Sequence, residues 1–220
     1  MILVHMRRNP TGQRGVFFSR ICFGPPPMGS ALWDIVGDGP EGMESMESLH
    51  QLEARLGYTF TNSDLLRSAL YHSSYANEHR GMGIASNERL EFLGDAVLGF
   101  VSADYLYRKH PDLPEGELTR IRAALVCEES LHEVAQSLHL GDFLMLGKGE
   151  ESGGGRRRPS ILADAVEAVL AAVYLDGGID KVRALIHRIL LEKEQEEVVE
   201  NRRRDCKTEL QELVQRKPNQ

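Results

Sequence analysis

The sequence is poor in cysteine and has no long apolar run. Three cysteines, Cys22, Cys127 and Cys206, are spread over 220 residues and lack the paired spacing of zinc or redox sites. No apolar stretch approaches the roughly 20 residues that a membrane span requires. These absences argue against a cysteine-based metal or redox centre and against a membrane partner. They predict a reduced, soluble, cytoplasmic protein.

A basic excess is also missing. The chain has 26 Lys and Arg residues against 33 Asp and Glu residues, which gives a net charge of -7. Surfaces that bind phosphate backbones usually carry a basic excess, so the total argues against a generic nucleic-acid surface. The charge is uneven, however: residues 192–200 are strongly acidic, whereas residues 156–158 and 202–207 are basic. The local distribution of charge, rather than the net charge, is therefore the evidence that bears on nucleic-acid binding.

The periodicity of apolar residues divides the chain into three parts. Residues 1–46 contain Pro25, Pro26 and Pro27 and show no period, which predicts an irregular extension. Residues 47–200 show a helical period throughout and no convincing strand alternation, so this domain is predicted to be all-α. Helices are expected at 47–56, 65–70, 87–109, 114–125, 130–138, 161–175 and 182–191, with a glycine-rich loop at 147–159.

Acidic residues interrupt two of these helices in a regular way. Glu88, Glu91 and Asp95 are three and four residues apart, so at about 100° per residue they fall within an arc of roughly 60°. Asp164 and Glu167 are the only breaks in the apolar stretch 161–173. A helix that is apolar nearly all round belongs inside the fold.

Buried carboxylates require a positive partner, because desolvating an unpaired ion costs several kcal/mol. Arg89 is the only cation within either run, and it projects roughly 100° away from Glu88. Oxygen ligands without histidine or cysteine suit Mg²⁺, with Mn²⁺ as the alternative ion, and indicate no small-molecule cofactor. Two such ions about 4 Å apart suit displacement at a phosphodiester. A solvated helix face is the competing interpretation.

Four segments resemble the ribonuclease III family of bacteria. Residues 87–98 resemble its signature and residues 160–168 its second acidic helix, and residues 69–78 and 115–123 are also similar. The resemblance extends over about residues 48–217 in the family's order. It implies a ribonuclease III-type helical endonuclease domain at 47–200 that dimerises and cleaves double-stranded RNA.

The resemblance also implies roles for individual residues. The metal-binding carboxylates of the family match Glu91, Asp95, Asp164 and Glu167, of which Asp95 and Glu167 are the expected catalytic residues. Glu88 and Glu115 match further acids lining the same valley. The implied reaction hydrolyses both strands with two metal ions and leaves 5′-phosphate and 3′-hydroxyl ends with short 3′ overhangs, as in the maturation of ribosomal RNA precursors.

Cutting both strands requires two sites, which a symmetric homodimer supplies. The family dimerises through the signature helix, so Phe92 is the expected interface residue, and packing in the core is its alternative. Arg156, Arg157 and Arg158 are candidate RNA contacts; an ordinary basic loop is the alternative. His72 matches a recurrent family position, but a structural hydrogen-bonding role is the preferred interpretation.

Residues 201–220 resemble a linker and the first helix of a double-stranded RNA-binding domain of αβββα type. The rest of that domain is absent, so the sequence is either a fragment or belongs to a protein that works without the module.

Two other functions remain open. A non-catalytic dimeric scaffold that binds duplex RNA could use the same fold. A metal phosphohydrolase of nucleotides would more often have histidines among its ligands.

Overall fold

The computed structural model describes residues 6–8, 14–16 and 40–193. Residues 201–220, where the start of an RNA-binding domain was expected, lie outside this part. The chain divides into two compact units, Met1–Gly42 and Met43–Gln220. In the first unit β1 (Met6–Arg8) pairs antiparallel with β2 (Arg14–Val16). The prediction of irregular backbone is wrong for these two strands, which are too short to show a period of apolar residues.

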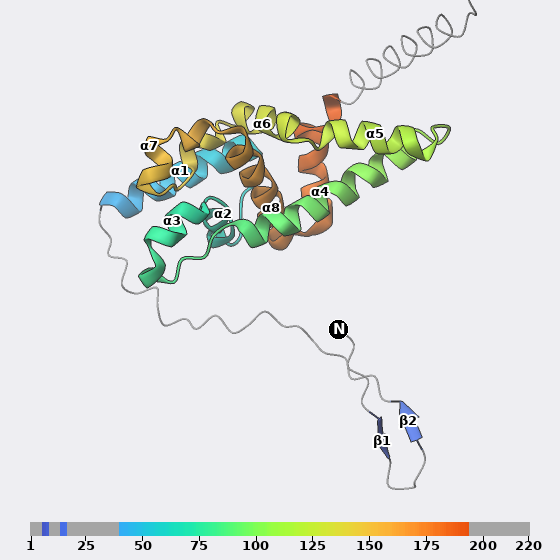
Figure 1. The fold of residues 1–220 in the computed structure, drawn as a ribbon, viewed down its shortest axis with the longest axis horizontal. Helices are drawn as coiled ribbons and strands as arrows, with labels where there is room; N and C mark the ends of the chain where they lie inside the picture. Colours follow the sequence, from blue (N-terminus) through green and yellow to red (C-terminus); the bar gives the residue numbers. More distant parts are fainter. Residues whose placement is uncertain (1–5, 9–13, 17–39, 194–220) are drawn as a thin grey trace, which may run out of the picture. The chain divides into compact units, whose positions relative to one another are not determined.

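The remaining described elements, which end at residue 193, are helical, as expected for this part of the domain predicted at residues 47–200 (Figure 1). The α-helices are α1 (Pro40–Leu56), α2 (Ser63–Ala69), α3 (Ser73–Glu78), α4 (Glu88–Lys109), α5 (Glu115–Leu125), α6 (Glu128–Ser137), α7 (Lys148–Ser152) and α8 (Pro159–Ile189). The 3-10 helices are η1 (Arg80–Met82), η2 (Leu140–Phe143), η3 (Gly155–Arg157) and η4 (Leu191–Lys193).

The ends of the long helices follow from local chemistry. α4 stops at Lys109, just before Pro111, because the residue preceding a proline disfavours helical backbone. α5 starts directly after Pro114. α2 begins at an asparagine cap, where the Asn62 side chain accepts a hydrogen bond from the backbone N–H of Asp64 at 3.1 Å. The short helices α3 and α7 were not predicted, because one or two turns give too little periodicity.

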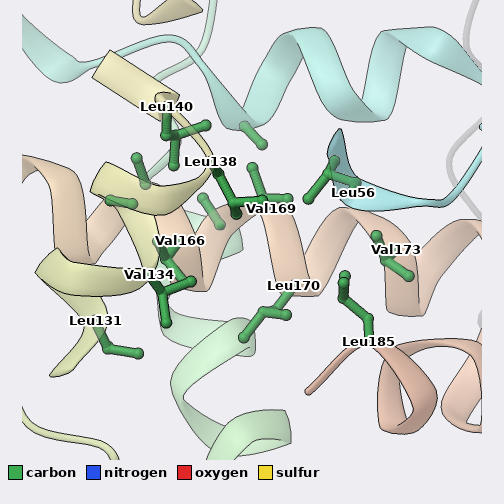
Figure 2. Packing of buried hydrophobic residues seen from close by; sticks show 14 of the residues in the cluster. Leu56, Leu131, Val134, Leu138, Leu140, Val166, Val169, Leu170, Val173 and Leu185 are labelled. Carbon is green, nitrogen blue, oxygen red and sulfur yellow. The ribbon is translucent and has the colours of Figure 1, made fainter. Parts of the chain in front are cut away.

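The core is built around α8. Figure 2 shows Val166, Val169, Leu170 and Val173 of this helix among residues of α6 and α1. Those partners include Leu131 and Val134 of α6, Leu138 directly after it, and Leu56 of α1. The prediction that the apolar helix of residues 161–173 lies inside the fold is therefore confirmed.

A single residue interrupts α8. Gly178 has φ 79° and ψ -177°, so the helical backbone breaks there and resumes afterwards. Glycine tolerates this conformation because it has no Cβ. The break falls between the two predicted helices, 161–175 and 182–191. Val182, Leu185 and Ile186 of the second piece are buried again.

α4 and α8 approach each other closely at Gly94. A Cβ built on Gly94 would lie 1.9 Å from the backbone oxygen of Glu167, so only a residue without a side chain fits there. Phe92, two residues earlier, projects roughly 160° away from Gly94. It is 80% exposed and lies on the same side of α4 as Phe100 and Tyr107, which are 56% and 75% exposed. The alternative that Phe92 packs in the core is wrong.

None of the helices in the described ranges combines the length and the apolar character that crossing a membrane requires.

Candidate metal centre

Three predicted ligands converge where α4 meets α8. Glu91 comes from the first turn of α4, and Asp164 and Glu167 come from consecutive turns of α8. One carboxylate oxygen from each lies within 4.8 Å of the others, and all three side chains are half-buried. These residues form what we call the acidic trio. The close approach at Gly94 lets Glu91 reach α8, because Gly94 contacts the backbone of Glu167.

Burial and mutual repulsion make ionisation of the trio costly. Burial raises the pKa of Glu167 to about 7, and the charges of Asp95, Glu91 and Asp164 act in the same direction. Burial also raises the pKa of Glu91, with further contributions from Asp164, Glu88 and Asp95. Like charges in a half-buried site require a cation if all three groups are to be ionised together.

Asp164 differs from the other two in its neighbours. Burial raises its pKa, and the charge of Glu128, in the first turn of α6, adds to this effect. The charge of His72 acts in the opposite direction and lowers the pKa. Asp164 therefore lies between one repelling and one attracting group, in addition to the trio itself.

The donor set of the trio fits a hard divalent cation. All three candidate ligand atoms are carboxylate oxygens, with neither nitrogen nor sulfur among them. Such donors suit Mg²⁺ or Mn²⁺ and disfavour softer metals. The half-buried carboxylates, whose repulsion a dication would relieve, therefore fit the ion that the sequence predicted.

The other acids of α4 lie outside the trio. Asp95 is exposed, although its charge is the largest carboxylate contribution to the raised pKa of Glu167. Glu88 is also exposed and accepts a hydrogen bond from Ser86 at 2.7 Å. The helical spacing had placed Glu88, Glu91 and Asp95 on one side of α4, but only Glu91 faces α8 closely enough to join Asp164 and Glu167.

Glu115 lies at the other end of α4. It lines a cavity of about 360 Å³ between α4 and α5, together with Phe100, Tyr107, Leu118 and Arg122 among others. At 1.5 Å per residue, the part of α4 beside Glu115 is roughly 20 Å from Glu91. Within one chain Glu115 does not reach the trio. Its predicted place in the same valley stays a prediction.

The three arginines before α8 differ in what they bind. Arg156 donates to the carbonyls of Gly141 and Leu144, both at 2.8 Å, and pairs with Glu151 at 2.7 Å. Arg158 pairs with Glu150 at 2.7 Å. Arg157 is exposed, and no hydrogen bond or ion pair of its side chain occurs within the part of the chain that the structure describes. Arg157 is thus the best placed of the three to contact an external phosphate.

His72 has the hydrogen-bonding role that was expected. It caps α3, and its Nδ1 accepts a hydrogen bond from the N–H of Ser74 and lies 2.8 Å from the Ser74 hydroxyl. That hydroxyl accepts a hydrogen bond from the N–H of Gly147 at 2.9 Å. His72 thereby ties the start of α3 to the segment before α7, and its charge also acts on Asp164.

Sequence reasoning missed three residues that shape the site. Gly94 sets the helix approach, Glu128 acts electrostatically on Asp164, and the buried Asn87 precedes Glu91 by one turn. Gly94 and Asn87 lie inside the recognised signature, but no spacing rule distinguishes them. Glu128 begins an ordinary amphipathic helix and shows no sequence signal.

Comparison with known proteins places the chain among nucleases. A family model described as Ribonuclease-III-like matches residues 62–194. The chain is 48% identical over 171 residues to Ribonuclease 3 of Listeria monocytogenes, which covers 78% of this chain and 74% of the relative. It is 51% identical over 174 residues to Ribonuclease 3 of Pelotomaculum thermopropionicum, covering 79% and 72%.

Solved structures give the same result. The nuclease domain of ribonuclease III from Campylobacter jejuni, in a structure concerned with the region involved in its dimer formation, superposes with a TM-score of 0.60 at 42% identity. The match covers 64% of this chain and 94% of that domain. Dicer from Giardia shares the fold, with a TM-score of 0.51 at 24% identity, over 67% of this chain and 19% of Dicer.

Proposed function

Because the chain belongs to the ribonuclease III family, we propose that it hydrolyses phosphodiester bonds of double-stranded RNA at the acidic trio with divalent metal ions. As a member of this family the chain is an endoribonuclease. The proposal extends this to the substrate, to the residues that act and to the products. The observation that supports it most is the convergence of Glu91, Asp164 and Glu167 within 4.8 Å in a half-buried position.

The acidic trio is suited to bind divalent ions, and without such ions it is unsuited to catalyse hydrolysis. With its pKa raised to about 7, Glu167 is a poor candidate for a permanently charged structural group. Three carboxylates can instead share the charge of Mg²⁺ or Mn²⁺. The chemistry that such ions supply in phosphodiester hydrolysis is activation of the attacking water and stabilisation of the leaving oxygen.

The residues around the trio suggest how a second ion would be held. Asp95 faces solvent beside Glu167, and its carboxylate is the proposed fourth ligand. Two ions would need more oxygen donors than the three carboxylates of the trio offer, and Asp95 is the carboxylate outside the trio whose charge acts on Glu167. Glu88, which contributes to the raised pKa of Glu91, is proposed to keep the entrance to the site negative.

The proposed reaction adds the oxygen of water to phosphorus and breaks the bond between phosphorus and the 3′ oxygen. The leaving 3′ oxygen takes up a proton and becomes a hydroxyl, and the phosphate stays on the 5′ end of the next nucleotide. We propose that the two strands are cut with a short stagger that leaves 3′ overhangs, and that precursors of ribosomal RNA are among the substrates. Sequencing both ends of the products tests the polarity and the stagger.

Matched variants test the assignment directly. Purified protein should cleave a long RNA duplex with Mg²⁺ and should stop when EDTA is added. Glu167→Gln, which keeps the shape and removes the charge, should slow cleavage roughly 1000-fold. Glu192→Gln makes the same change at an exposed glutamate of η4 and should leave cleavage intact. A duplex left whole by the parent protein, or cut equally by Glu167→Gln, would contradict the proposal and favour a non-catalytic RNA-binding scaffold.

A dimer is proposed because the described residues of one chain contain one such trio. The exposed stripe of Phe92, Phe100 and Tyr107 on α4 is the proposed interface, since a large aromatic side chain in water is unfavourable. Phe92→Asp should shift the protein from dimer to monomer in sedimentation velocity. Met82→Asp, which alters another exposed apolar side chain, serves as the control. A parent protein that sediments as a monomer at micromolar concentration would rule the dimer out.

A further inference from the structure

Asn87 is buried at the start of α4. Within the described residues it is one of three buried polar side chains, with Glu53 and Ser102, and it is only 4% exposed. It occupies the cap position of α4, yet its side chain makes no capping hydrogen bond. The amide Nδ2 instead donates to the carbonyl of Ala69 at 3.1 Å. An asparagine that gives up its usual capping role for a distant partner serves the tertiary structure rather than the helix.

The backbone of Asn87 strengthens the same attachment. Its N–H donates to the carbonyl of Tyr71 at 2.8 Å. The amide and the backbone together fix Asn87 by two hydrogen bonds to the last residue of α2 and to the connection that follows it. Two donors on one residue hold both its position and its orientation, which a single bond would not.

Asn87 is in turn bonded directly to Glu91. The carbonyl of Asn87 accepts the backbone N–H of Glu91 at 2.9 Å and that of Leu90 at 2.8 Å. These bonds close the first turn of α4. The position of Asn87 therefore sets the position of the Glu91 backbone, from which the Glu91 side chain extends toward α8.

The connection that anchors Asn87 is linked on its other side to α8. Met145 donates its N–H to the carbonyl of Leu70 at 2.9 Å, and His72 donates its N–H to the carbonyl of Met145 at 3.1 Å. The preceding carbonyl, of Leu144, accepts from Arg156, which lies just before α8. These hydrogen bonds, with the short backbone segments between them, thus join the first turn of α4 to the beginning of the helix that carries Asp164 and Glu167.

We propose that Asn87 is a positioning residue of the acidic site, whose amide sets the first turn of α4 so that Glu91 meets Asp164 and Glu167 at the distance that a divalent ion requires. The inference rests on the proposed function, because it takes the trio to be a metal site. Asn87 touches no reacting atom in this role and acts through Glu91. Partners that orient metal ligands typically change metal affinity or activity by about 10- to 100-fold when they are replaced.

Alanine and serine at this position both remove the tether and differ in what they leave at the start of α4. Asn87→Ala removes the donor to Ala69 and leaves no polar side-chain atom. Asn87→Ser also loses the reach to Ala69, but its short polar side chain is favoured over alanine at a helix start and should recover part of the thermal stability. The control is Glu53→Ala, which removes another buried bond between side chain and backbone, from the N–H of Phe60 to Glu53 at 2.8 Å.

The measurements are the dissociation constant for Mn²⁺ by calorimetry, the midpoint of thermal unfolding, and kcat and KM on duplex RNA. Both Asn87 variants should bind Mn²⁺ at least about 10-fold more weakly, with a lower kcat and a nearly unchanged KM for RNA. Asn87→Ser should unfold at a higher temperature than Asn87→Ala but bind the ion no better. Glu53→Ala should unfold at a lower temperature than the parent and keep the parent's affinity for Mn²⁺.

Two results would overturn the inference, and they are distinguishable. Asn87 variants that lose thermal stability but bind Mn²⁺ as the parent does would show that Asn87 is purely structural, while the nuclease assignment would stand. If the parent protein binds no divalent ion and cuts RNA no faster than Glu167→Gln does, both the proposed function and this inference are wrong.

Discussion

Glu167 and Asp176 lie on the same helix, but their surroundings move their pKa values in opposite directions. Burial raises the pKa of Glu167 to about 7, and three neighbouring carboxylates add to the effect. Burial also acts to raise the pKa of Asp176, but hydrogen bonds from Thr61, Tyr58 and Asn62 outweigh it, so the pKa lies below its usual value. A carboxylate surrounded by other carboxylates suggests a site for a cation. The charge of a carboxylate surrounded by hydrogen-bond donors is already stabilised by those donors.

The contacts of Asp176 show what a structural carboxylate looks like in this fold. It accepts hydrogen bonds from the hydroxyl of Tyr58 at 2.7 Å and from the N–H groups of Thr61 and Asn62, both at 2.9 Å. These bonds fasten the loop before α2 to α8. In the acidic trio the carboxylates repel one another, and the pKa values of all three are raised. The difference between the two regions can be tested by changing one at a time.

The largest expected effect is the loss of cleavage in Glu167→Gln. Metal-assisted charge stabilisation is worth several kcal/mol in the transition state, so the rate should fall roughly 1000-fold. In EDTA at pH 8 the same variant should unfold at a higher temperature than the parent, because one repelling charge is gone. A rise of about 2–4 °C, the shift that ~1 kcal/mol produces at this length, is expected in calorimetry. An active variant, or a metal-free variant less stable than the parent, would contradict the comparison.

Gly94→Ala should have the next largest effect, because it displaces the trio without removing a charge. A methyl group at residue 94 would meet the backbone oxygen of Glu167, so α4 and α8 must separate. A displacement of about 1 Å at a reactive site costs about 100-fold in rate, and overpacking costs about 1–3 kcal/mol of stability. Gly149→Ala, in α7 and with open space around the added group, is the control for kcat and for unfolding in urea. Equal behaviour of the two variants would disprove the close approach.

Asp176→Asn should weaken the fold and leave the chemistry intact. Three donors would lose their charged acceptor, and the free energy of unfolding should fall by about 1–2 kcal/mol in urea titrations. Affinity for Mn²⁺ and kcat should stay at the parent's values, since Asp176 is not among the carboxylates that act on Glu167. A large loss of metal affinity in Asp176→Asn would show that the two regions are coupled.

The smallest expected effect concerns acid. Because the pKa of Asp176 in the folded protein is below its ordinary value of 3.8, the unfolded chain takes up the proton first as the pH falls. The stability that Asp176 contributes is therefore complete above that value and disappears as the pH drops through the folded-state value. The difference in unfolding free energy between the parent and Asp176→Asn should be constant from pH 7 to pH 5 and smaller at pH 3. A difference in unfolding free energy that grows as the pH falls would contradict a lowered pKa of Asp176 in the folded protein.

Much of the fold could be predicted from the sequence, because long helices repeat their pattern many times. α4 and α5 begin and end close to the predicted residues, and the apolar run of α8 is buried as expected. The pattern failed where elements are short: α3, α7 and the β1–β2 pair provide too few residues for a period to emerge.

The site could be predicted only in part, for a different reason. Spacing along α4 identifies which acids share a side of one helix, but it does not tell which of them faces a second helix. Glu91 joined the trio and Asp95 stayed exposed because the contact at Gly94 fixes how α4 lies against α8. The ion pairs that occupy Arg156 and Arg158 likewise depend on partners that only the folded chain brings near.

The contact at Gly94 also bears on how the site behaves with temperature. A side chain that separates two helices has rotamers, and each rotamer allows a different spacing. At Gly94 no side chain separates the helices, and the main chain of α4 lies directly against the carbonyl of Glu167. Bond lengths and planar peptide groups are rigid, so the distance between the two main chains can hardly change. Warming should therefore loosen the apolar layers around α8 well before it changes the gap that an ion between Glu91 and Glu167 must fill.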